Sequence, residues 1–406
     1  MTAARARHIA NLLQVHLEDL AFLWGQRREA LGSCKHTLRE YGELNERIEA
    51  HLQGLLVAEP AALVGWLQPQ LSGGDRNEVF AAAYALLRLD ESAATQAVVV
   101  EFSRAAGPAL AGLRDALSLA PNVLFATEIQ SALDQAKPIT AVSAAVVLAN
   151  HRLLDGQSPR LAGLLEDIDP AVCELAWRAA MVTDAVAPLS APKRPFNHAL
   201  GHAAPTVRSA GWAAAAWAAQ ARAMPLLRQF AASGELPALH WLAVLGGPED
   251  LPLLQKAALD MSDGAARCAL LARFGHPSAL NALLLWMSDS DPALAVAAGE
   301  AFTRIIGAEV RGERKALPVE KDADEFTREM AHEVWFPDVP KARSLMERHG
   351  AEWAAGTRWC NGVRVDGEVS REQLIQLDLE ARWDVAARAA LAGRPVSAPE
   401  IGRAHV

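Results

Sequence analysis

Two consecutive stretches decide the fold: LPALHWLAVLGGPEDLPLLQKAAL (residues 236–259) and GAARCALLARFGHPSALNALLLWM (264–287). Each contains an apolar helical segment, a glycine break, a proline and a second apolar helical segment. The glycines at 246–247 and 275 supply the left-handed turn that ends a helix. Pro248 and Pro277 then fall in the first turn of the next helix, where a missing N–H costs nothing. Each stretch therefore predicts a pair of helices that must stack on its neighbours to bury its apolar face.

The same punctuation recurs along most of the chain, at intervals of about 27 to 35 residues. Predicted starts of the first helix of each pair are Asp75, Gly107–Pro108, Lys137–Pro138, Asp169–Pro170, Ala204–Pro205, Leu236–Pro237, Asp263–Gly264 and Asp291–Pro292. At Asp169 and Asp291 the aspartate before the proline is the expected N-cap. A regular period of this length, in a sequence that is helical nearly throughout, predicts an all-α, right-handed α-solenoid of two-helix repeats.

The first 60 residues differ from the repeats and predict a helical hairpin. An apolar stripe with helical spacing runs along each of two long segments, and the short turn GSCKH (32–36) lies between them. Thr37, with Glu40 three residues later, is typical of a capping box at the start of the second helix. We therefore expect three regions: the hairpin at 1–60, the repeats at 61–307 and a C-terminal region at 308–406.

The C-terminal region predicts a charged insert followed by a divergent helical cap. Residues 311–329, RGERKALPVEKDADEFTRE, are rich in charge and should lie outside the stack. Ser370 with Gln373 predicts a second capping box. It should open one final helix that carries Leu374, Leu377, Ala381 and Val385. The cap is expected to dock on the last clear repeat helix, at 291–307.

Three repeat segments carry a family resemblance: DPAVCELAWRAAM (169–181), APTVRSAGWAAAAWA (204–218) and DPALAVAAGEAFTRIIG (291–307). They resemble the short HEAT repeats of the phycobilisome-lyase type, which implies HEAT-like two-helix units. The arginine common in such repeats is present at Arg208 and absent from the other two copies. Residues 22–58 are similar to the N-terminal element of an uncharacterised bacterial HEAT-like family. Its members are often encoded beside type VI secretion genes, which implies an accessory or adaptor role.

Composition and charge exclude several classes of function. A net charge of −9 and a pI of about 5.8 disfavour a general nucleic-acid-binding protein, which needs a basic face. The four cysteines are far apart and form no C-x-x-C pair, as expected for a protein in a reducing compartment without a zinc site. The N-terminus has no apolar signal segment, and no run is long enough to span a bilayer. We therefore expect a cytoplasmic protein without a membrane contact.

Few histidines, cysteines or carboxylates have the spacing of a catalytic or metal site. His198 and His202 could share one helix face, but the glutamate of H-E-x-x-H is missing and Gly201 weakens the helix, so an irregular surface loop is favoured. His16 and His51 lie on or beside apolar stripes and are expected at helix–helix contacts. Because phosphate-binding and nucleophile motifs are also missing, no catalytic, cofactor or metal residue is predicted.

Aromatic and basic residues around the charged insert are the candidate partner contact. Most tryptophans of the repeats, including Trp177 and Trp212, should fill gaps between alanines in the core. Trp335 and Phe336 instead lie between the insert and a proline-rich turn. They suit either a protein partner or the docking of the cap on the last repeat. The predicted contact residues are Arg311, Arg314, Lys315, Trp335 and Phe336.

The sequence therefore predicts a non-enzymatic protein–protein interaction scaffold or adaptor, an accessory of a bacterial type VI secretion system by the resemblance above. Two alternatives remain open. A HEAT-like DNA-repair glycosylase would need a basic groove with exposed aromatic side chains. A lyase acting on a chromophore or a protein would need a reactive group such as Cys173, Cys268, His198 or His202.

Overall fold

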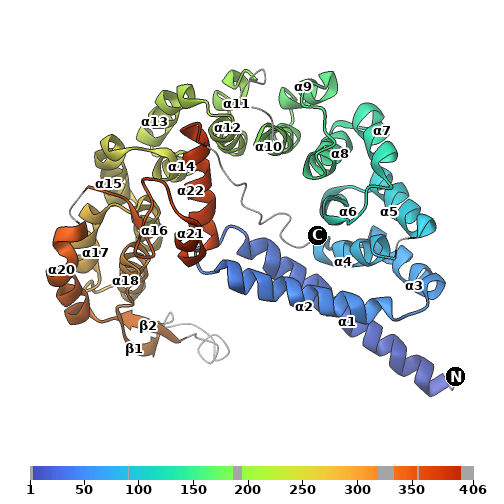
Figure 1. The fold of residues 1–406 in the computed structure, drawn as a ribbon, viewed down its shortest axis with the longest axis horizontal. Helices are drawn as coiled ribbons and strands as arrows, with labels where there is room; N and C mark the ends of the chain where they lie inside the picture. Colours follow the sequence, from blue (N-terminus) through green and yellow to red (C-terminus); the bar gives the residue numbers. More distant parts are fainter. Residues whose placement is uncertain (1–2, 90, 186–193, 319–332, 354–355, 395–406) are drawn as a thin grey trace. The chain divides into compact units, whose positions relative to one another are not determined.

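The computed structural model describes residues 3–89, 91–185, 194–318, 333–353 and 356–394 (Figure 1). These residues form two compact units. One contains the described residues up to Ala221 together with those from Ala390 onward, and the other runs from Arg222 to Ala389. Both units are mostly helical, and helices that follow one another along the chain pack together.

The first unit begins with the predicted hairpin. Helix α1 (Ala3–Ala30) packs against α2 (Leu38–Leu56) and also against α4 (Arg76–Leu87). The capping box of α2 is present: the Thr37 hydroxyl accepts the Glu40 N–H, and the Glu40 carboxylate accepts the Thr37 N–H at 2.7 Å. Two orphan donors of the helix end are satisfied in this way.

A row of alternate helices forms the interior of the first unit (Figure 1). Each helix of the row packs against the next, and each begins at a residue that the sequence predicts. Asp75 caps the first by accepting the N–H groups of Asn77 and Glu78. Because α4 has neighbours on several sides, every residue from Val79 to Leu87 is buried. The row consists of α4, α6 (Gly107–Leu119), α8 (Pro138–Asn150), α10 (Pro170–Ala185) and α12 (Pro205–Trp217).

The remaining helices of this unit pack beside the row. They are more exposed and, except for α5, shorter, and each contacts the row helix next to it in sequence. This arrangement gives every two-helix pair a neighbour on which to bury its apolar face. These helices are α3 (Pro60–Leu67), η1 (Gln68–Ser72), α5 (Ser92–Arg104), α7 (Ala126–Gln135), α9 (Pro159–Leu165) and α11 (Asn197–Leu200).

The second unit begins with three further helix pairs: α13 (Met224–Ala232) with α14 (Leu236–Leu245), α15 (Leu251–Asp260) with α16 (Gly264–Phe274), and α17 (Leu280–Trp286) with α18 (Pro292–Ile306). Helix α14 packs on α16, and α16 packs on α18. Gly275 and Gly307 end their helices in the left-handed conformation, at φ +70° and +73°, as their positions predict. Gly246 does not, because its φ is −65° and the chain leaves α14 in an extended conformation.

Strands appear after the repeats, which the all-helical expectation did not include. Strand β1 (Arg311–Ala316) pairs with β2 (Glu333–Pro337) in an antiparallel hairpin, and β3 (Trp359–Cys360) pairs with β4 (Val363–Arg364). The charged insert predicted at 311–329 therefore begins as a strand, and its part from 319 onward lies outside the described residues. Strand β2 packs on α18, where the cap was expected to dock.

The final helix predicted from Ser370 is two helices. The capping box of Ser370 and Gln373 opens α21 (Arg371–Gln376), but Leu377 is extended. Asp378 then accepts the Ala381 N–H at 2.8 Å and starts α22 (Leu379–Leu391). Leu377 and Ala381 still reach one apolar cluster, together with Cys360, Val363 and Val365. One apolar stripe therefore spans two helices, which explains why the pattern reads as a single helix.

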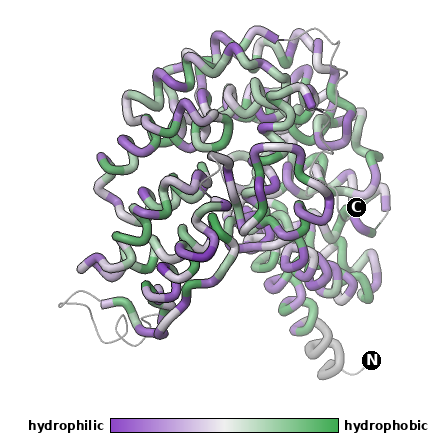
Figure 2. Tube along the Cα trace, turned by 60° about the vertical axis from the view of Figure 1, so that its left-hand side comes forward, coloured by the Kyte–Doolittle hydropathy of each residue, from purple (hydrophilic) through white to green (hydrophobic). Residues whose placement is uncertain are grey.

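Hydrophobic and hydrophilic residues alternate along single helices in both units (Figure 2). Trp177, Trp212 and Trp286 are buried, as predicted for core tryptophans of the repeats, whereas Trp217 and Trp241 are half-buried. Among the described residues, no helix combines the length and the apolar character needed to cross a membrane.

Candidate functional site

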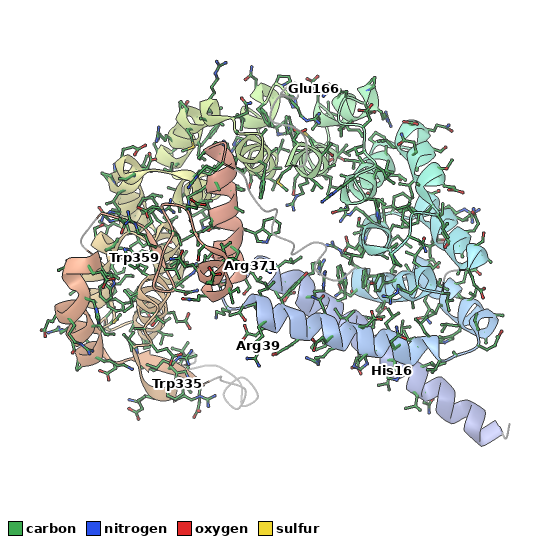
Figure 3. All side chains as sticks on the ribbon, in the orientation of Figure 1. His16, Arg39, Glu166, Trp335, Trp359 and Arg371 are labelled. Atoms are coloured by element: carbon green, nitrogen blue, oxygen red, sulfur yellow. The ribbon has the colours of Figure 1, made fainter. Side chains whose placement is uncertain are left out.

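The five residues predicted to contact a partner lie on one hairpin. Arg311, Arg314 and Lys315 are on β1, and Trp335 and Phe336 are on β2. Arg314 lies opposite Trp335 in the register of the two strands, so their side chains share a face. The Arg314 guanidinium lies 6.0 Å from the centre of the Trp335 ring, and Trp335 is 46% exposed (Figure 3). The hairpin thus presents an aromatic ring and a cation together at the surface.

Each basic side chain of the hairpin has an acidic neighbour. Lys315 Nζ lies 2.8 Å from a Glu313 oxygen, and Arg314 Nε lies 3.4 Å from a Glu333 oxygen. All four side chains are more than half exposed, so water screens these pairs and each contributes little stability. The charges can therefore exchange these neighbours for groups on a partner.

Strand β2 fixes the hairpin on α18. Phe336 is half-buried, since alternate residues of a strand point to opposite faces. Gly299 of α18 faces Pro337, and a Cβ at residue 299 would lie 2.8 Å from the Pro337 Cβ. The backbone N–H of Asp338 donates to the Val310 carbonyl at 2.6 Å. The hairpin is therefore a positioned surface, which lowers the ordering cost of binding.

C-terminal to the hairpin along the chain, the segment from Thr357 to Leu391 contacts the repeat helices again. Arg358 is 4% exposed, and its guanidinium donates to carbonyls at the C-terminal ends of α14 and α16. Nε reaches the Phe274 carbonyl at 2.7 Å, and Nη1 reaches those of Val244 and Gly246 at 3.1 and 3.0 Å. Burial lowers the pKa of this guanidinium well below its ordinary value. The unpaired carbonyls and negative dipole ends of two helices compensate for that burial.

The backbone after Arg358 continues along the helix ends. The Trp359 N–H donates to the Gly275 carbonyl at 2.8 Å, and the Gly362 N–H donates to the Ile305 carbonyl at 3.2 Å. Any Cβ at Gly275 would lie 2.2 Å from the Trp359 oxygen, and one at Gly307 would lie 2.5 Å from Asn361. The two helix-ending glycines therefore also allow a second segment of backbone to approach.

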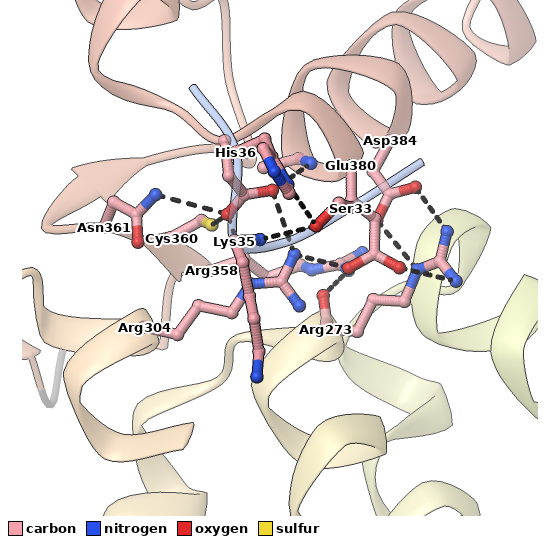
Figure 4. Close-up of polar contacts among 12 residues, drawn as sticks. Ser33, Lys35, His36, Arg273, Arg304, Arg358, Cys360, Asn361, Glu380 and Asp384 are labelled. Atoms are coloured by element: carbon pink, nitrogen blue, oxygen red, sulfur yellow. Dashed lines mark hydrogen bonds and ion pairs between the residues drawn. The ribbon is translucent and has the colours of Figure 1, made fainter. Parts of the chain in front are cut away.

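Ion pairs connect the same helix ends to α22 (Figure 4). Arg273 binds Asp384 through two bonds of 2.9 and 2.8 Å. Arg304 approaches Glu380 at 2.6 Å and Asp378 at 3.3 Å. We call Arg273, Arg304, Arg358 and these three carboxylates the arginine cluster. Because arginine neutralises each carboxylate, the cluster suits a structural contact better than acid–base chemistry.

The buried thiols are poor nucleophiles. Burial raises the pKa of Cys360 and of Cys268 to about 12, and that of Cys173 to about 11. A thiol with such a pKa is almost entirely protonated at neutral pH, and the thiolate is the reactive form. Cys173 also donates to the Leu165 carbonyl.

The two histidines weighed as a metal pair do not share a helix face. Helix α11 ends at Leu200, so His198 lies on it and His202 lies in the turn that follows. His202 Nδ1 accepts the Ala204 N–H at 3.0 Å, which occupies one of its nitrogens. Within the described part of the chain, no three His, Cys, Asp or Glu side chains are gathered for a metal ion.

Sequence reasoning missed the arginine cluster. Arg273 and Arg304 did carry a signal, since each lies in the last turn of a helix, where a cation is favoured. Their partners Asp384 and Asp378 lie 111 and 74 residues further along the chain. Pairs at such separations leave no local pattern in a single sequence.

A scan against protein-family models gave no match for this chain, and a comparison with curated proteins found no similar chain.

Proposed function

We propose that this protein is a non-enzymatic, cytoplasmic scaffold or adaptor for other proteins, built as a right-handed solenoid of HEAT-like repeats. Support for the repeat architecture comes from the helices that begin where the sequence period places them, because each of these helices packs on the next one within its unit. Stacked repeats present an extended surface, and extended surfaces of this kind bind proteins.

The proposed binding of other proteins rests on the hairpin of β1 and β2. Tryptophan and arginine are the residue types most enriched among the residues that dominate binding energies at protein interfaces. Here Arg314 and Trp335 lie on one exposed face, with Arg311 and Lys315 on the same strand, and β2 packs on α18. Such a surface suits a partner that offers carboxylates around an apolar contact.

The alternative functions receive less support from the described residues. The thiols of Cys173 and Cys268, which a lyase could use, are buried and have raised pKa values. A DNA glycosylase would need a basic groove, whereas the chain has a net charge of −9. Binding to duplex DNA with a steep salt dependence would reverse this preference.

The experiment compares partners captured by two matched double variants. The tagged full-length chain is crosslinked in its native cells and its partners are identified by mass spectrometry. We expect Arg314→Ala with Trp335→Ala to lose the partners of the wild type. The control, Arg371→Ala with Ile375→Ala, removes an arginine and an apolar side chain that are also exposed, on α21, and should retain them.

The resemblance of residues 22–58 makes type VI secretion components the first partners to test. Recovery of those components with the wild type and the control, but not with the hairpin variant, would support both parts of the proposal. If all three proteins capture the same partners, the hairpin is not the binding surface. If none captures a protein above background, the adaptor function is wrong.

A further inference from the structure

Two imidazole rings face each other across the N-terminal hairpin. His16 of α1 and His51 of α2 approach with their Nδ1 atoms 3.2 Å apart, and their rings meet edge to face at an interplanar angle of 66°. Figure 3 shows His16 on α1. Two neutral imidazoles at this distance can share one proton between two nitrogens, or both nitrogens can bind the same metal ion.

A glycine makes room for this arrangement. Gly54 lies inside α2, where glycine costs helix stability relative to alanine. The His16 ring lies directly over it, and a Cβ at residue 54 would lie 2.6 to 2.8 Å from three ring atoms. Gly42, in the same helix, has no atom within 4 Å of such a Cβ. Because Gly54 has no Cβ, the His16 ring fits in the position that faces His51.

A carboxylate lies beside the pair. Asp19 is one helical turn from His16 on α1, and its Oδ2 lies 3.5 Å from His51 Nδ1. Its side chain is 47% exposed and that of His51 is 26% exposed, so water and ions can reach the site. His16, His51 and Asp19 therefore offer two nitrogens and an oxygen, the donors that Zn²⁺ uses in three-ligand sites.

We propose that His16 and His51 bind a divalent transition-metal ion such as Zn²⁺, with Asp19 as the third protein ligand. At Zn–N distances of about 2.05 Å, nitrogens 3.2 Å apart subtend an angle of about 103° at the metal, close to tetrahedral. The three groups are not yet gathered for a metal ion, so the Asp19 side chain turns toward the imidazoles on binding. Water completes the coordination, and the metal links α1 to α2.

The test is isothermal titration of the full-length chain with ZnCl2, after chelator treatment and with Cys34→Ser as the common background to remove the exposed thiol. The double variant His16→Gln and His51→Gln removes both nitrogens and should weaken binding by at least about tenfold, because even the loss of a group that only supports a ligand costs that much. Changing the other histidine pair, His198→Gln with His202→Gln, should leave the affinity unchanged.

A second variant keeps all three ligands and moves one of them. Gly54→Ala displaces the His16 ring from its present position and should also weaken Zn²⁺ binding, whereas Gly42→Ala should not. Circular dichroism checks that each variant keeps its helices. Replacing Zn²⁺ by Co²⁺ adds a visible absorption spectrum, which should show nitrogen and oxygen ligands in the wild type and the two controls, but not in the variants of His16, His51 or Gly54.

Two results would overturn the proposal. If the wild type binds no Zn²⁺ below millimolar concentration, the imidazoles only share a proton. If the His16 and His51 double variant binds as tightly as the wild type, the metal lies elsewhere. Neither result bears on the hairpin of β1 and β2, so this inference and the proposed function can fail separately.

Discussion

At the scale of single residues, the Arg358 side chain joins the ends of two helices of the second unit. Its guanidinium reaches carbonyls of Ala243, Val244 and Gly246 at one helix end and of Phe274 at the next. It also lies 4.4 Å from the centre of the Phe274 ring. One planar fork of donors therefore satisfies several carbonyls that a helix leaves unpaired.

Removing the Arg358 guanidinium should destabilise the second unit strongly. We expect Arg358→Ala to lower its free energy of unfolding by at least about 3 kcal/mol, because several buried carbonyls lose their donor at once. Arg358→Lys should recover little, since an ammonium cannot reproduce the planar fork. Chemical denaturation measures the effect. Arg371→Ala, at an exposed arginine of the same unit, should change stability by no more than about 0.5 kcal/mol. An equal effect of the two alanine variants would contradict this role of Arg358.

Two features of position 275 require glycine: its left-handed backbone and the close approach of Trp359. A comparison with Gly234 distinguishes their costs. Alanine at a left-handed position costs about 1–2 kcal/mol. Gly234 is also left-handed, at φ +83°, but a Cβ there meets no atom within 4 Å. A Cβ at Gly275 would lie 2.2 Å from the Trp359 carbonyl oxygen. We expect Gly275→Ala to cost clearly more than Gly234→Ala in thermal unfolding. Equal costs would show that the approach of Trp359 adds nothing.

At the scale of elements, helix ends explain which predictions from the sequence succeeded. Caps depend on residues within one turn of each other, so Thr37 with Glu40 and Ser370 with Gln373 were predicted correctly. The break at Leu377 was missed because its cause is tertiary. Asp378, which starts α22, is also held by Arg304, a residue from a repeat helix 74 positions earlier.

The capping box of α2 should contribute measurably to the stability of the first unit. Thr37→Ala removes the acceptor for the Glu40 N–H and should cost about 1 kcal/mol at neutral pH. Denaturant unfolding followed by far-ultraviolet circular dichroism would measure the loss. A substitution at Arg39, an exposed neighbour in the same turn, is the control and should have little effect. No change in Thr37→Ala would mean that water replaces the cap.

The stability that the same capping box contributes should depend on pH. The Thr37 N–H, and then its hydroxyl, hold the pKa of Glu40 below its ordinary value of 4.5. A carboxyl whose pKa falls on folding stabilises the protein above its unfolded pKa, and this contribution is lost as pH falls through the folded pKa. Glu40→Gln removes the titrating group, so the stability difference between wild type and variant should shrink below about pH 4.5. A difference that stays constant from pH 7 to pH 3 would contradict the assignment.

At the scale of the whole molecule, the helix starts were predictable and the division into two units was not. A short apolar period and its punctuation repeat from Asp75 to Gly307 without a visible change at residue 222, where the second unit begins. The division reflects how densely segments contact one another in three dimensions, and a one-dimensional pattern does not carry that information.

Two compact units should unfold in more than one step. We expect calorimetry of the full-length chain to contain at least two transitions. Thr37→Ala should shift the transition of the first unit, and Arg358→Ala should shift that of the second. Hydrogen exchange measured by mass spectrometry would assign each transition to its residues. A single transition that both substitutions shift equally would show that the chain unfolds as one cooperative system.

By itself, the sequence determined the helix starts, their caps and the grouping of candidate contact residues around residues 311–336, because these features depend on neighbours a few positions apart. It also marked Gly275 and Gly307 as helix ends, which both are. Only the tertiary structure decided that the segment from Arg358 to Gly362 lies against those glycines, that Arg273 meets Asp384, and that Arg314 lies opposite Trp335. Hydrogen bonds and ion pairs between distant residues fix these contacts, and their geometry exists only after the helices have packed.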